Sequence, residues 1–326
     1  MQPVLWFSMN LSRPIRFSPY YQSRVWGGRR LETLLGRSLP DATTPFGESW
    51  EVSDRAEAMS ATADGVTLNE LWQNHRAEVF GGLKSDSPCF PLLMKILDAC
   101  DDLSIQVHPP ASRAVELGGD PKTEMWFIAH ADQGAKIYAG LKNGVTRAQF
   151  DAALQNGTLA EVVHVLEPVT GDCLFIPSGR IHAIGAGLLI YEIQQNSDTT
   201  YRVFDWNRVG LDGKPRQLHI AESLASIDFE DFEPRMQSRA AEGPLVSCEF
   251  FDVMLGSQAG QLGRAGENLT LAVTQGQLEL AGEIFRAGDF AIIPSSMEDA
   301  ARDITSRSAD AQWLEIRIPA ARLSDA

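Results

Sequence analysis

One short stretch of the sequence carries polar side chains at a spacing that suits a metal ion. In Leu103–Pro109, the residues Ser104, Gln106 and His108 alternate with aliphatic ones. Alternate side chains of a β-strand point to the same face, so we expect these three to lie together. Three polar groups on one face of so apolar a strand need a wet cavity or a metal ion. Gln106 and His108 are therefore a candidate ligand pair.

Two further stretches offer donors of the same kind. Lys122 and Glu124 open the apolar segment KTEMW, and His182 lies in IPSGRIHAIG, where the flanking glycines favour a turn. An exposed alternating pair is the other interpretation of Lys122 and Glu124. Two imidazoles, one carboxylate and one amide oxygen together suit Zn²⁺ or a similar borderline metal. Such a set leaves room for a water molecule or a substrate oxygen.

The remaining polar features are less specific. A polar run follows the apolar GLLIY and extends to Asp205; it is either a solvated loop or a strand that carries Glu192 into a barrel. The other four histidines are interpreted as surface or hydrogen-bonded residues: His75, His130, His164 and His219.

Short strand-like segments must position these groups. They are four to ten residues long, rich in aliphatic and aromatic residues, and separated by Gly, Pro, Asp or Asn, which is typical of a sandwich or barrel. Those before the acidic stretch near residue 230 are FPLLMKILDA, LSIQVHP, TEMWFIAHA, AKIYAGL, HVLEPV, DCLFIPS and LLIYEIQQ. Helical periodicity or end signals predict helices within 67–82, 111–119, 146–157 and 215–227.

An internal repeat indicates two related β-barrels in tandem. Gly171–Ser178 reads GDCLFIPS and Gly288–Ser295 reads GDFAIIPS. His182 follows the proline of the first copy by five residues, whereas Asp299 takes that position after the second. We therefore expect one barrel to hold a metal ion and the other to be structural. The predicted division is a lead-in at 1–13, a metal-binding domain with added helices at 14–235, and a smaller β-domain without metal ligands at 236–326.

Composition limits the partners. The net charge is −15 and no run of Lys or Arg occurs, which argues against nucleic-acid binding. No stretch approaches 18 consecutive apolar residues, and no signal peptide is recognisable, so we expect a cytoplasmic protein without membrane spans. The cysteines lack paired spacing and are expected to be reduced and buried: Cys89, Cys100, Cys173 and Cys248.

Several long motifs, in order, closely resemble those of the type I mannose-6-phosphate isomerases. They are VWGGRRL, FPLLMKILDA, LSIQVHP, KTEMW, IPSGRIHAIG and EIQQNSDTTYRVFDWNR, and the resemblance runs from about Pro14 to Ser226. Only 58 residues separate Glu124 from His182, which leaves no room for a large helical insertion. The sequence is therefore similar to the short bacterial form, with two cupin-like (jelly-roll) β-barrels and a few added helices.

The resemblance also implies roles for individual residues. It implies one Zn²⁺ per chain, held by Gln106, His108, Glu124 and His182, and the interconversion of mannose 6-phosphate and fructose 6-phosphate. Arg202 matches the catalytic arginine of the family, and Lys122 and Glu192 match polar groups that line the same pocket. Lys95 and Ser104 match positions associated with the substrate phosphate, whose binding would orient the reacting end.

The implied reaction moves a proton from C2 to C1 through a cis-enediolate, whose charge a metal ion or an arginine would stabilise. The base is left open among Glu192, Lys122 and a zinc-bound hydroxide, and a lysine would need a lowered pKa. The alternatives are another metal-dependent cupin enzyme and a non-catalytic sugar-phosphate-binding protein. We expect a monomer or a weak homo-oligomer.

Overall fold

The structure is a computed structural model that describes residues 10–83, 85–238 and 242–319. These residues form β-strands with a few short helices, so the predicted mainly β fold is confirmed. Contacts divide the chain into a larger unit, Pro19–Ser60 with Phe90–Val246, and a smaller one drawn from Met1–Ser18, Ala61–Cys89 and Ser247–Ala326. The division predicted at residue 235 therefore stays a prediction, because residues 61–89 group with the C-terminal part. The first nine residues of the predicted lead-in lie outside the described residues.

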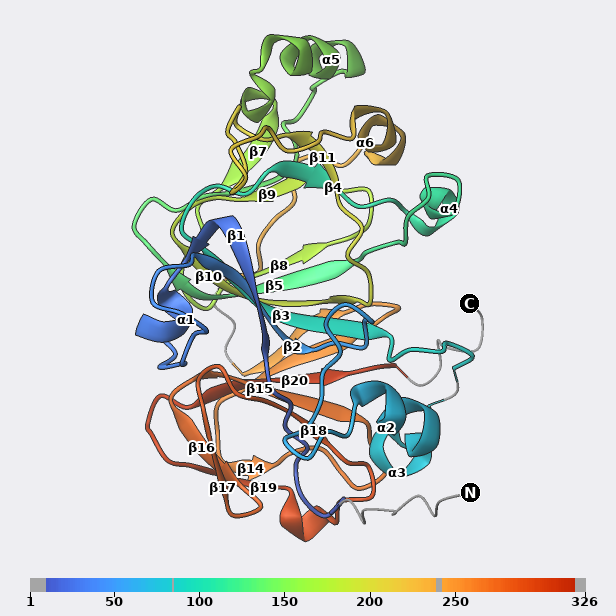
Figure 1. The fold of residues 1–326 in the computed structure, drawn as a ribbon, viewed down its shortest axis with the longest axis vertical. Helices are drawn as coiled ribbons and strands as arrows, with labels where there is room; N and C mark the ends of the chain where they lie inside the picture. Colours follow the sequence, from blue (N-terminus) through green and yellow to red (C-terminus); the bar gives the residue numbers. More distant parts are fainter. Residues whose placement is uncertain (1–9, 84, 239–241, 320–326) are drawn as a thin grey trace. The chain divides into compact units, whose positions relative to one another are not determined.

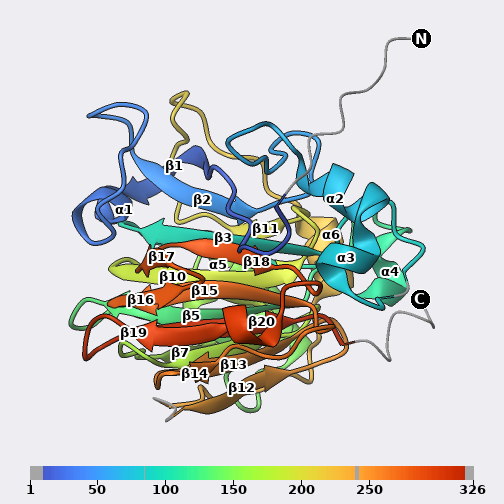
Figure 2. The same ribbon diagram turned by 90° about the horizontal axis from the view of Figure 1, so that it is seen from below.

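Two antiparallel sheets build the larger unit. The first has the order β1 (Tyr20–Gly28), β2 (Phe46–Val52), β3 (Leu92–Ala99), β10 (Leu188–Gln195), β5 (Glu124–Ala131) and β8 (Cys173–Ile176). The second has the order β11 (Tyr201–Phe204), β4 (Ile105–Val107), β9 (His182–Ile184), β6 (Ile137–Leu141) and β7 (Val163–Leu166). Figure 1 shows the second sheet above the first, and β1, β2, β3, β10 and β5 follow one another down Figure 2.

The space between these two sheets is apolar at one end and polar at the other. Leu188 and Ile190 of β10 belong to a buried cluster that also takes Ile137 and Ile184 from the second sheet. Because side chains alternate along a strand, Glu192 lies on the same face of β10 as Leu188 and Ile190. The inward face of β10 thus changes from aliphatic to charged along one strand.

Helices cover the outer face of the second sheet. Helix α5 (Arg147–Asn156) begins at Thr146 with a capping box and ends at Gly157, whose φ of 71° a glycine adopts without strain. Phe150 of α5 packs into the cluster that covers this face. The prediction at 146–157 is confirmed. The helices at 111–119 and 215–227 are shorter than predicted: α4 (Ala111–Ala114) and α6 (Ile220–Ser226). The larger unit also contains α1 (Arg30–Thr33) and the 3₁₀ helix η1 (Leu159–Glu161).

The smaller unit repeats the double-sheet plan. One sheet has the order β12 (Gly243–Ser247), where the chain enters this unit, then β13 (Asp252–Gly256), β20 (Gln312–Arg317), β15 (Leu269–Gln275) and β18 (Phe290–Ile293). The other has the order β14 (Gly260–Gln261), β19 (Asp303–Ser306), β16 (Gln277–Leu280) and β17 (Glu283–Arg286), and η2 is Asp299–Ala301. Its main core cluster is formed by hydrophobic residues, among them Leu271, Phe285 and Trp313.

The helix predicted at 67–82 is two helices in the structure, α2 (Leu68–Asn74) and α3 (Arg76–Phe80). His75 interrupts them because its φ of −130° and ψ of 26° are not helical. The predicted repeat is confirmed locally, since Gly171 before β8 and Gly288 before β18 have φ of 95° and 97°.

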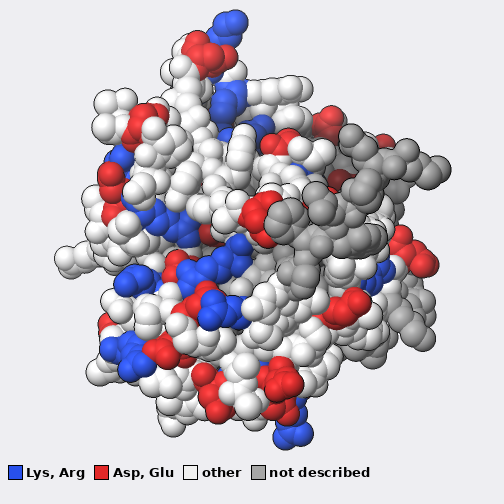
Figure 3. Space-filling model, turned by 60° about the horizontal axis from the view of Figure 1, so that its bottom comes forward, with Lys and Arg blue, Asp and Glu red and all other residues white. Residues whose placement is uncertain are grey.

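On the face shown in Figure 3, Lys and Arg side chains lie among Asp and Glu side chains and form no continuous basic field. In the described part of the chain, no helix is long and apolar enough to cross a membrane.

All four cysteines are free, but the expectation that they are buried holds only for Cys173, and Cys100 is exposed.

Candidate active site

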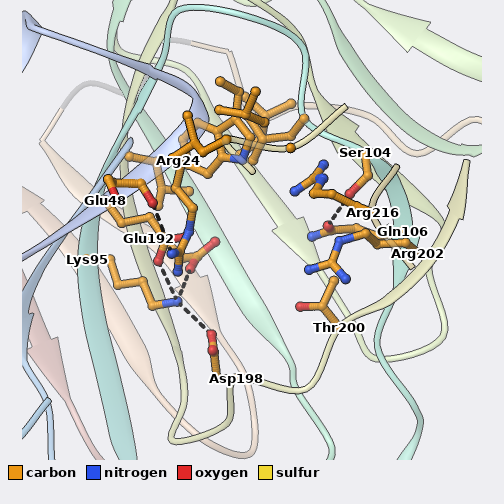
Figure 4. Close-up of a pocket in the computed structure, with 18 of the residues that line it drawn as sticks. Arg24, Glu48, Lys95, Ser104, Gln106, Glu192, Asp198, Thr200, Arg202 and Arg216 are labelled. Atoms are coloured by element: carbon orange, nitrogen blue, oxygen red, sulfur yellow. Dashed lines mark hydrogen bonds and ion pairs between the residues drawn. The ribbon is translucent and has the colours of Figure 1, made fainter. Parts of the chain in front are cut away.

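A cavity of about 690 Å³ lies at the polar end of the larger unit. Both sheets contribute to it, with Lys95 from β3, Glu192 from β10, Gln106 from β4 and Arg202 from β11. Of the residues predicted from the sequence, the structure brings six to its wall: Lys95, Ser104, Gln106, Lys122, Glu192 and Arg202. Figure 4 labels all of these except Lys122. The other three predicted residues form a buried cluster beside it: His108, Glu124 and His182.

Strand register places the predicted ligands together. Gln106 of β4 pairs with His182 of β9 on one side and with Arg202 of β11 on the other. His182 is therefore the first residue of a strand, not part of a turn as its flanking glycines suggested. One ligand atom of each of His108, Glu124 and His182 lies within 4.8 Å of the others.

Both histidines direct a nitrogen lone pair at the Glu124 carboxylate. Nδ1 of His108 lies 2.8 Å from the carbonyl oxygen of Thr199, and Nδ1 of His182 lies 2.9 Å from that of Arg180. A carbonyl only accepts, so each Nδ1 carries the proton and each Nε2 does not. The two Nε2 atoms lie 3.5 and 3.6 Å from Glu124 oxygens.

Neither imidazole takes up a second proton readily. Burial, together with the neighbouring His108, lowers the pKa of His182 to about 3. Burial and the Lys122 ammonium lower the pKa of His108, and Glu124 offsets this only in part. Lone pairs thus face a carboxylate across a gap with no proton to join them. This arrangement is repulsive unless a cation lies between the groups.

The donor set fits a metal ion. Among the described residues, His108 Nε2 and Glu124 Oε1 are buried without a hydrogen-bond partner, as expected of atoms that ligate an ion. The Gln106 amide lies beside them, with Nε2 3.3 Å from His182 Nε2 and Oε1 accepting from Ser104 at 3.2 Å. The oxygen and nitrogen of an amide are interchangeable in such an assignment, so Gln106 can direct its oxygen toward the cluster. Nowhere else in the described chain do three His, Cys, Asp or Glu residues gather in this way.

A row of alternating charges lies next to the cluster. Lys122 Nζ lies 2.7 Å from Glu124 Oε2 and 3.7 Å from Glu192 Oε1, and the indole of Trp126 donates to Glu192 Oε2 at 3.1 Å. Burial acts to lower the pKa of Lys122, but the carboxylates of Glu124 and Glu192 outweigh it and raise the pKa overall. Burial raises the pKa of Glu192, and Lys122 offsets part of that rise. Lys122 is therefore held as an ammonium ion. Of the two neighbouring carboxylates, Glu192 has its pKa raised and Glu124 has its pKa lowered, so Glu192 is the better proton acceptor.

Arg202 stands apart from these charges. Its backbone N–H donates to His219 Nδ1 at 3.3 Å, which fixes the strand end. No carboxylate in the described residues forms an ion pair with its guanidinium, and its buried Nε has no partner. Burial and the like charge of Arg216 lower the pKa of Arg202. Arg202 is a cation with free donors at the cavity wall.

Sequence reasoning missed part of the wall. Arg24, Glu48, Asp198, Arg216 and His219 also line the cavity. His219 was interpreted as a surface or hydrogen-bonded histidine; it accepts a hydrogen bond from the Arg202 N–H, and it also lines the cavity. The polar run after GLLIY gave a usable signal for Asp198, and the prediction that Glu192 is carried inward is confirmed.

Comparison with known proteins gives one consistent result. A family model described as "Phosphomannose isomerase type I, catalytic domain" matches residues 15–120. The chain is 34% identical over 301 residues to the mannose-6-phosphate isomerase ManA of Bacillus subtilis, which covers 87% of this chain and 93% of the relative. It is also 34% identical over 304 residues to a mannose-6-phosphate isomerase of Streptococcus mutans, covering 88% and 94%. The crystal structure of the mannose 6-phosphate isomerase from Bacillus subtilis superposes with a TM-score of 0.80 at 30% identity, covering 94% of this chain and 99% of that one.

Proposed function

The chain belongs to the type I phosphomannose isomerase family, and we propose that it interconverts mannose 6-phosphate and fructose 6-phosphate with one Zn²⁺ per chain. The observation that carries the metal-dependent chemistry is the buried cluster in which two unprotonated imidazole nitrogens face Glu124 beside the cavity. The family supports the reaction, and this cluster supports the cofactor.

Zn²⁺ would be held by His108, Glu124, His182 and the amide oxygen of Gln106. Two imidazoles with oxygen donors suit Zn²⁺ better than hard cations such as Mg²⁺, which prefer oxygen ligands alone. When bound, the ion supplies Lewis-acid polarisation of the substrate oxygens at C1 and C2.

Glu192 is the proposed proton acceptor at C2. It is buried, its pKa is raised by that burial, and a base whose pKa lies nearer to neutrality transfers protons more effectively. It takes the proton from C2, the electrons of the C2–H bond form the C1–C2 double bond of the enediolate, and the π electrons of the C1 carbonyl move to O1. It then returns the proton to C1 as the C2 carbonyl forms, and the hydroxyl proton of O2 passes to O1. Trp126 holds Oε2 of Glu192, which leaves Oε1 directed toward Lys122.

Lys122 and Arg202 are the proposed electrophiles of this chain. Lys122 is flanked by Glu124 and Glu192, so it remains protonated and can donate hydrogen bonds to the substrate oxygens near Glu192. Arg202 has unused donors at the facing wall, where it would stabilise the negative charge that develops on O1 or O2. These assignments keep the base as Glu192 and give Lys122 a donor's role.

A coupled assay for fructose 6-phosphate formation, with and without a chelator, tests this proposal. The parent should lose activity with the chelator and recover it with Zn²⁺, and Arg202→Ala should lower kcat. Activity that survives both treatments would refute the mechanism. The same assay separates two other readings, because another metal-dependent cupin enzyme would bind metal without isomerising mannose 6-phosphate, and a binding protein would bind the sugar phosphate without turnover.

We also propose a cytoplasmic location and a monomer or weak homo-oligomer. The four free cysteines support a reducing compartment. Sedimentation of the zinc-loaded protein at several concentrations tests the oligomeric state, and a stable dimer at micromolar concentration would contradict it.

A further inference from the structure

The wall of the cavity that carries Lys95 is poorly suited to a phosphate. Lys95 Nζ lies 3.4 Å from Glu48 Oε2, 3.8 Å from Glu192 Oε1 and 3.4 Å from Asp198 Oδ1. Three carboxylates within 4 Å thus occupy this ammonium, and two of them also pair with other cations, Glu48 with Arg24 and Glu192 with Lys122. A dianion placed there would find each of these cations already paired and would have to approach three carboxylates at close range.

The second cation on this wall is also engaged. Arg24 Nε donates to Glu48 Oε1 at 2.6 Å, and Nη1 donates to the backbone carbonyl of Ser23 at 3.3 Å. Glu48 therefore holds Arg24 and Lys95 together. Figure 4 shows these residues on one side of the cavity with Glu192 and Asp198.

The opposite side of the cavity differs because its cations keep unused donors. Figure 4 shows Arg216, Arg202 and Ser104 there, together with Thr200. Asp205, which is 6% exposed and follows β11 directly, pairs with Arg216, and the carboxylate of Asp212 also lines the cavity. This side presents two guanidinium groups and hydroxyl groups to the cavity, a combination that recognises phosphate oxygens.

Arg216 has one edge of its guanidinium free. Nε and Nη2 donate to Asp205 Oδ2 and Oδ1 at 2.6 and 2.5 Å, which is a side-on bidentate pair. Among the described residues Nη1 has no partner, so the edge formed by Nη1 and Nη2 remains for a second bidentate contact. The pair with Asp205 also fixes the side chain in place before any ligand arrives, which reduces the entropy lost on binding.

Arg208 provides the contrast. It also donates to Asp205, through Nε and Nη2 at 3.1 and 3.0 Å, but its Nη1 is occupied by Asp101 Oδ2 at 3.2 Å. Arg208 does not line the cavity, whereas Arg216 does. The two arginines therefore share one carboxylate, and only Arg216 offers free donors to a ligand.

We propose that Arg216 is the residue that recognises the phosphate of the substrate, through the Nη1–Nη2 edge left free by Asp205. This inference rests on the proposed function, because it assigns the phosphate end of the same sugar-phosphate site. Ser104 remains a second donor on this side. Lys95 then organises the carboxylates of the other wall, and its predicted contact with phosphate becomes the competing assignment.

The test compares Arg216→Gln with Arg208→Gln as a matched control, since each removes one of the two arginines on Asp205. Inorganic phosphate is titrated calorimetrically into the full chain at constant ionic strength, and KM and kcat for mannose 6-phosphate are measured alongside. Losing charge-assisted hydrogen bonds to a dianion should weaken phosphate binding and raise KM by roughly 10- to 100-fold in Arg216→Gln, with a smaller change in kcat. Arg208→Gln should change both by less than about 3-fold. The thermal midpoint of each variant shows whether it is folded.

Two variants make the result specific. Arg216→Lys keeps the charge but loses the bidentate edge, so it should restore only part of the phosphate affinity. Lys95→Gln should leave inorganic phosphate binding within about 3-fold. The proposal is overturned if Arg216→Gln is folded and binds phosphate like the parent, or if Lys95→Gln or Arg208→Gln carries the loss instead. A parent that binds phosphate through Arg216 yet does not isomerise mannose 6-phosphate would contradict the proposed function and leave this phosphate contact standing.

Discussion

His182 Nε2 lies 3.6 Å from Glu124 Oε1, and no proton joins them. The pKa of His182 is lowered to about 3, so at neutral pH the imidazole presents a lone pair to a carboxylate in a buried place. Removing these groups from water costs free energy that their own contact does not return. A bound cation would compensate both groups, so the stability of the fold should depend on the metal.

Chelation should therefore lower the thermal midpoint of the parent protein. A ligand that binds only the folded state at a hundred times its Kd stabilises it by about 2.7 kcal/mol. For a chain of 326 residues that corresponds to a fall of roughly 4 °C when the metal is removed. Differential scanning calorimetry with zinc, with chelator, and with zinc restored measures it.

Two histidine variants show whether the fall in thermal midpoint comes from metal lost at this cluster or from a general effect of the chelator. His182→Gln should show little further loss on chelation, because the cluster has lost a ligand. His219→Ala removes a histidine that lines the cavity but lies outside the cluster, and it should keep the full shift. Equal chelator responses in the two variants would contradict the assignment of the metal ligands.

Glu192→Gln should abolish most turnover while substrate still binds. Loss of a general base typically lowers the rate by 10²- to 10⁴-fold, and the amide keeps the shape and the acceptor for Trp126. The measurements are kcat, KM and the exchange of the C2 proton with deuterated solvent. Asp198→Asn is the matched control, since it also neutralises a carboxylate that faces Lys95, and it should cost less than about 10-fold. If Glu192→Gln still exchanged the C2 proton at the parent rate, another group would be the base.

Much of the metal cluster could be predicted because its pattern is local. The period-two spacing of Gln106 and His108 fixes a common face on any strand, and the GDxxxIPS repeat marked His182 by what the second copy lacks. The sequence could not reveal that β4 pairs with β9, which sets Gln106 against His182. Strand register depends on contacts between segments more than 70 residues apart, and no local signal encodes it.

The other residues of the cavity wall were harder to predict because their positions also depend on contacts between segments. Arg24 and Glu48 lie on the paired strands β1 and β2 and reach Lys95 only because β2 pairs with β3. Arg216 lies outside the strands, and its position depends on an ion pair with Asp205 eleven residues earlier. Residues 61–89 likewise gave helical signals that were correct in kind, but nothing local assigned them to the smaller unit.

Glu48 should make folding stability sensitive to acid. Burial acts to raise its pKa, but Lys95, Arg24 and the Trp50 indole outweigh this and lower the pKa from 4.5 to about 2. Because the folded-state pKa is below the unfolded one, the stabilisation is present above about pH 4.5 and is lost as the pH falls toward 2. The difference between the folded and unfolded pKa values of Glu48 corresponds to about 3 kcal/mol of folding stability, at 1.36 kcal/mol per pKa unit.

Urea unfolding of the parent and of Glu48→Gln between pH 7 and pH 3 measures this contribution. The variant should be less stable at pH 7, and the two curves should converge as the pH falls. Glu161→Gln, at an exposed position, is the control and should follow the parent throughout. Parallel curves for the parent and Glu48→Gln would contradict the prediction.

Gly185→Ala should damage the metal cluster through the backbone. Gly185 follows β9 directly, its N–H donates to the carbonyl oxygen of Lys136 at 2.8 Å, and a Cβ there would lie 2.4 Å from that oxygen. The backbone of Lys136, directly before the paired strand β6, cannot move aside cheaply, so β9 must shift and carry His182 with it. We expect a loss of roughly 1–3 kcal/mol in unfolding free energy and weaker zinc binding, measured by urea unfolding and by competition with a zinc-binding dye. Gly82→Ala, where the added Cβ meets nothing within 4 Å, should change neither. Parent-like zinc affinity in Gly185→Ala would show that β9 absorbs the clash without moving His182.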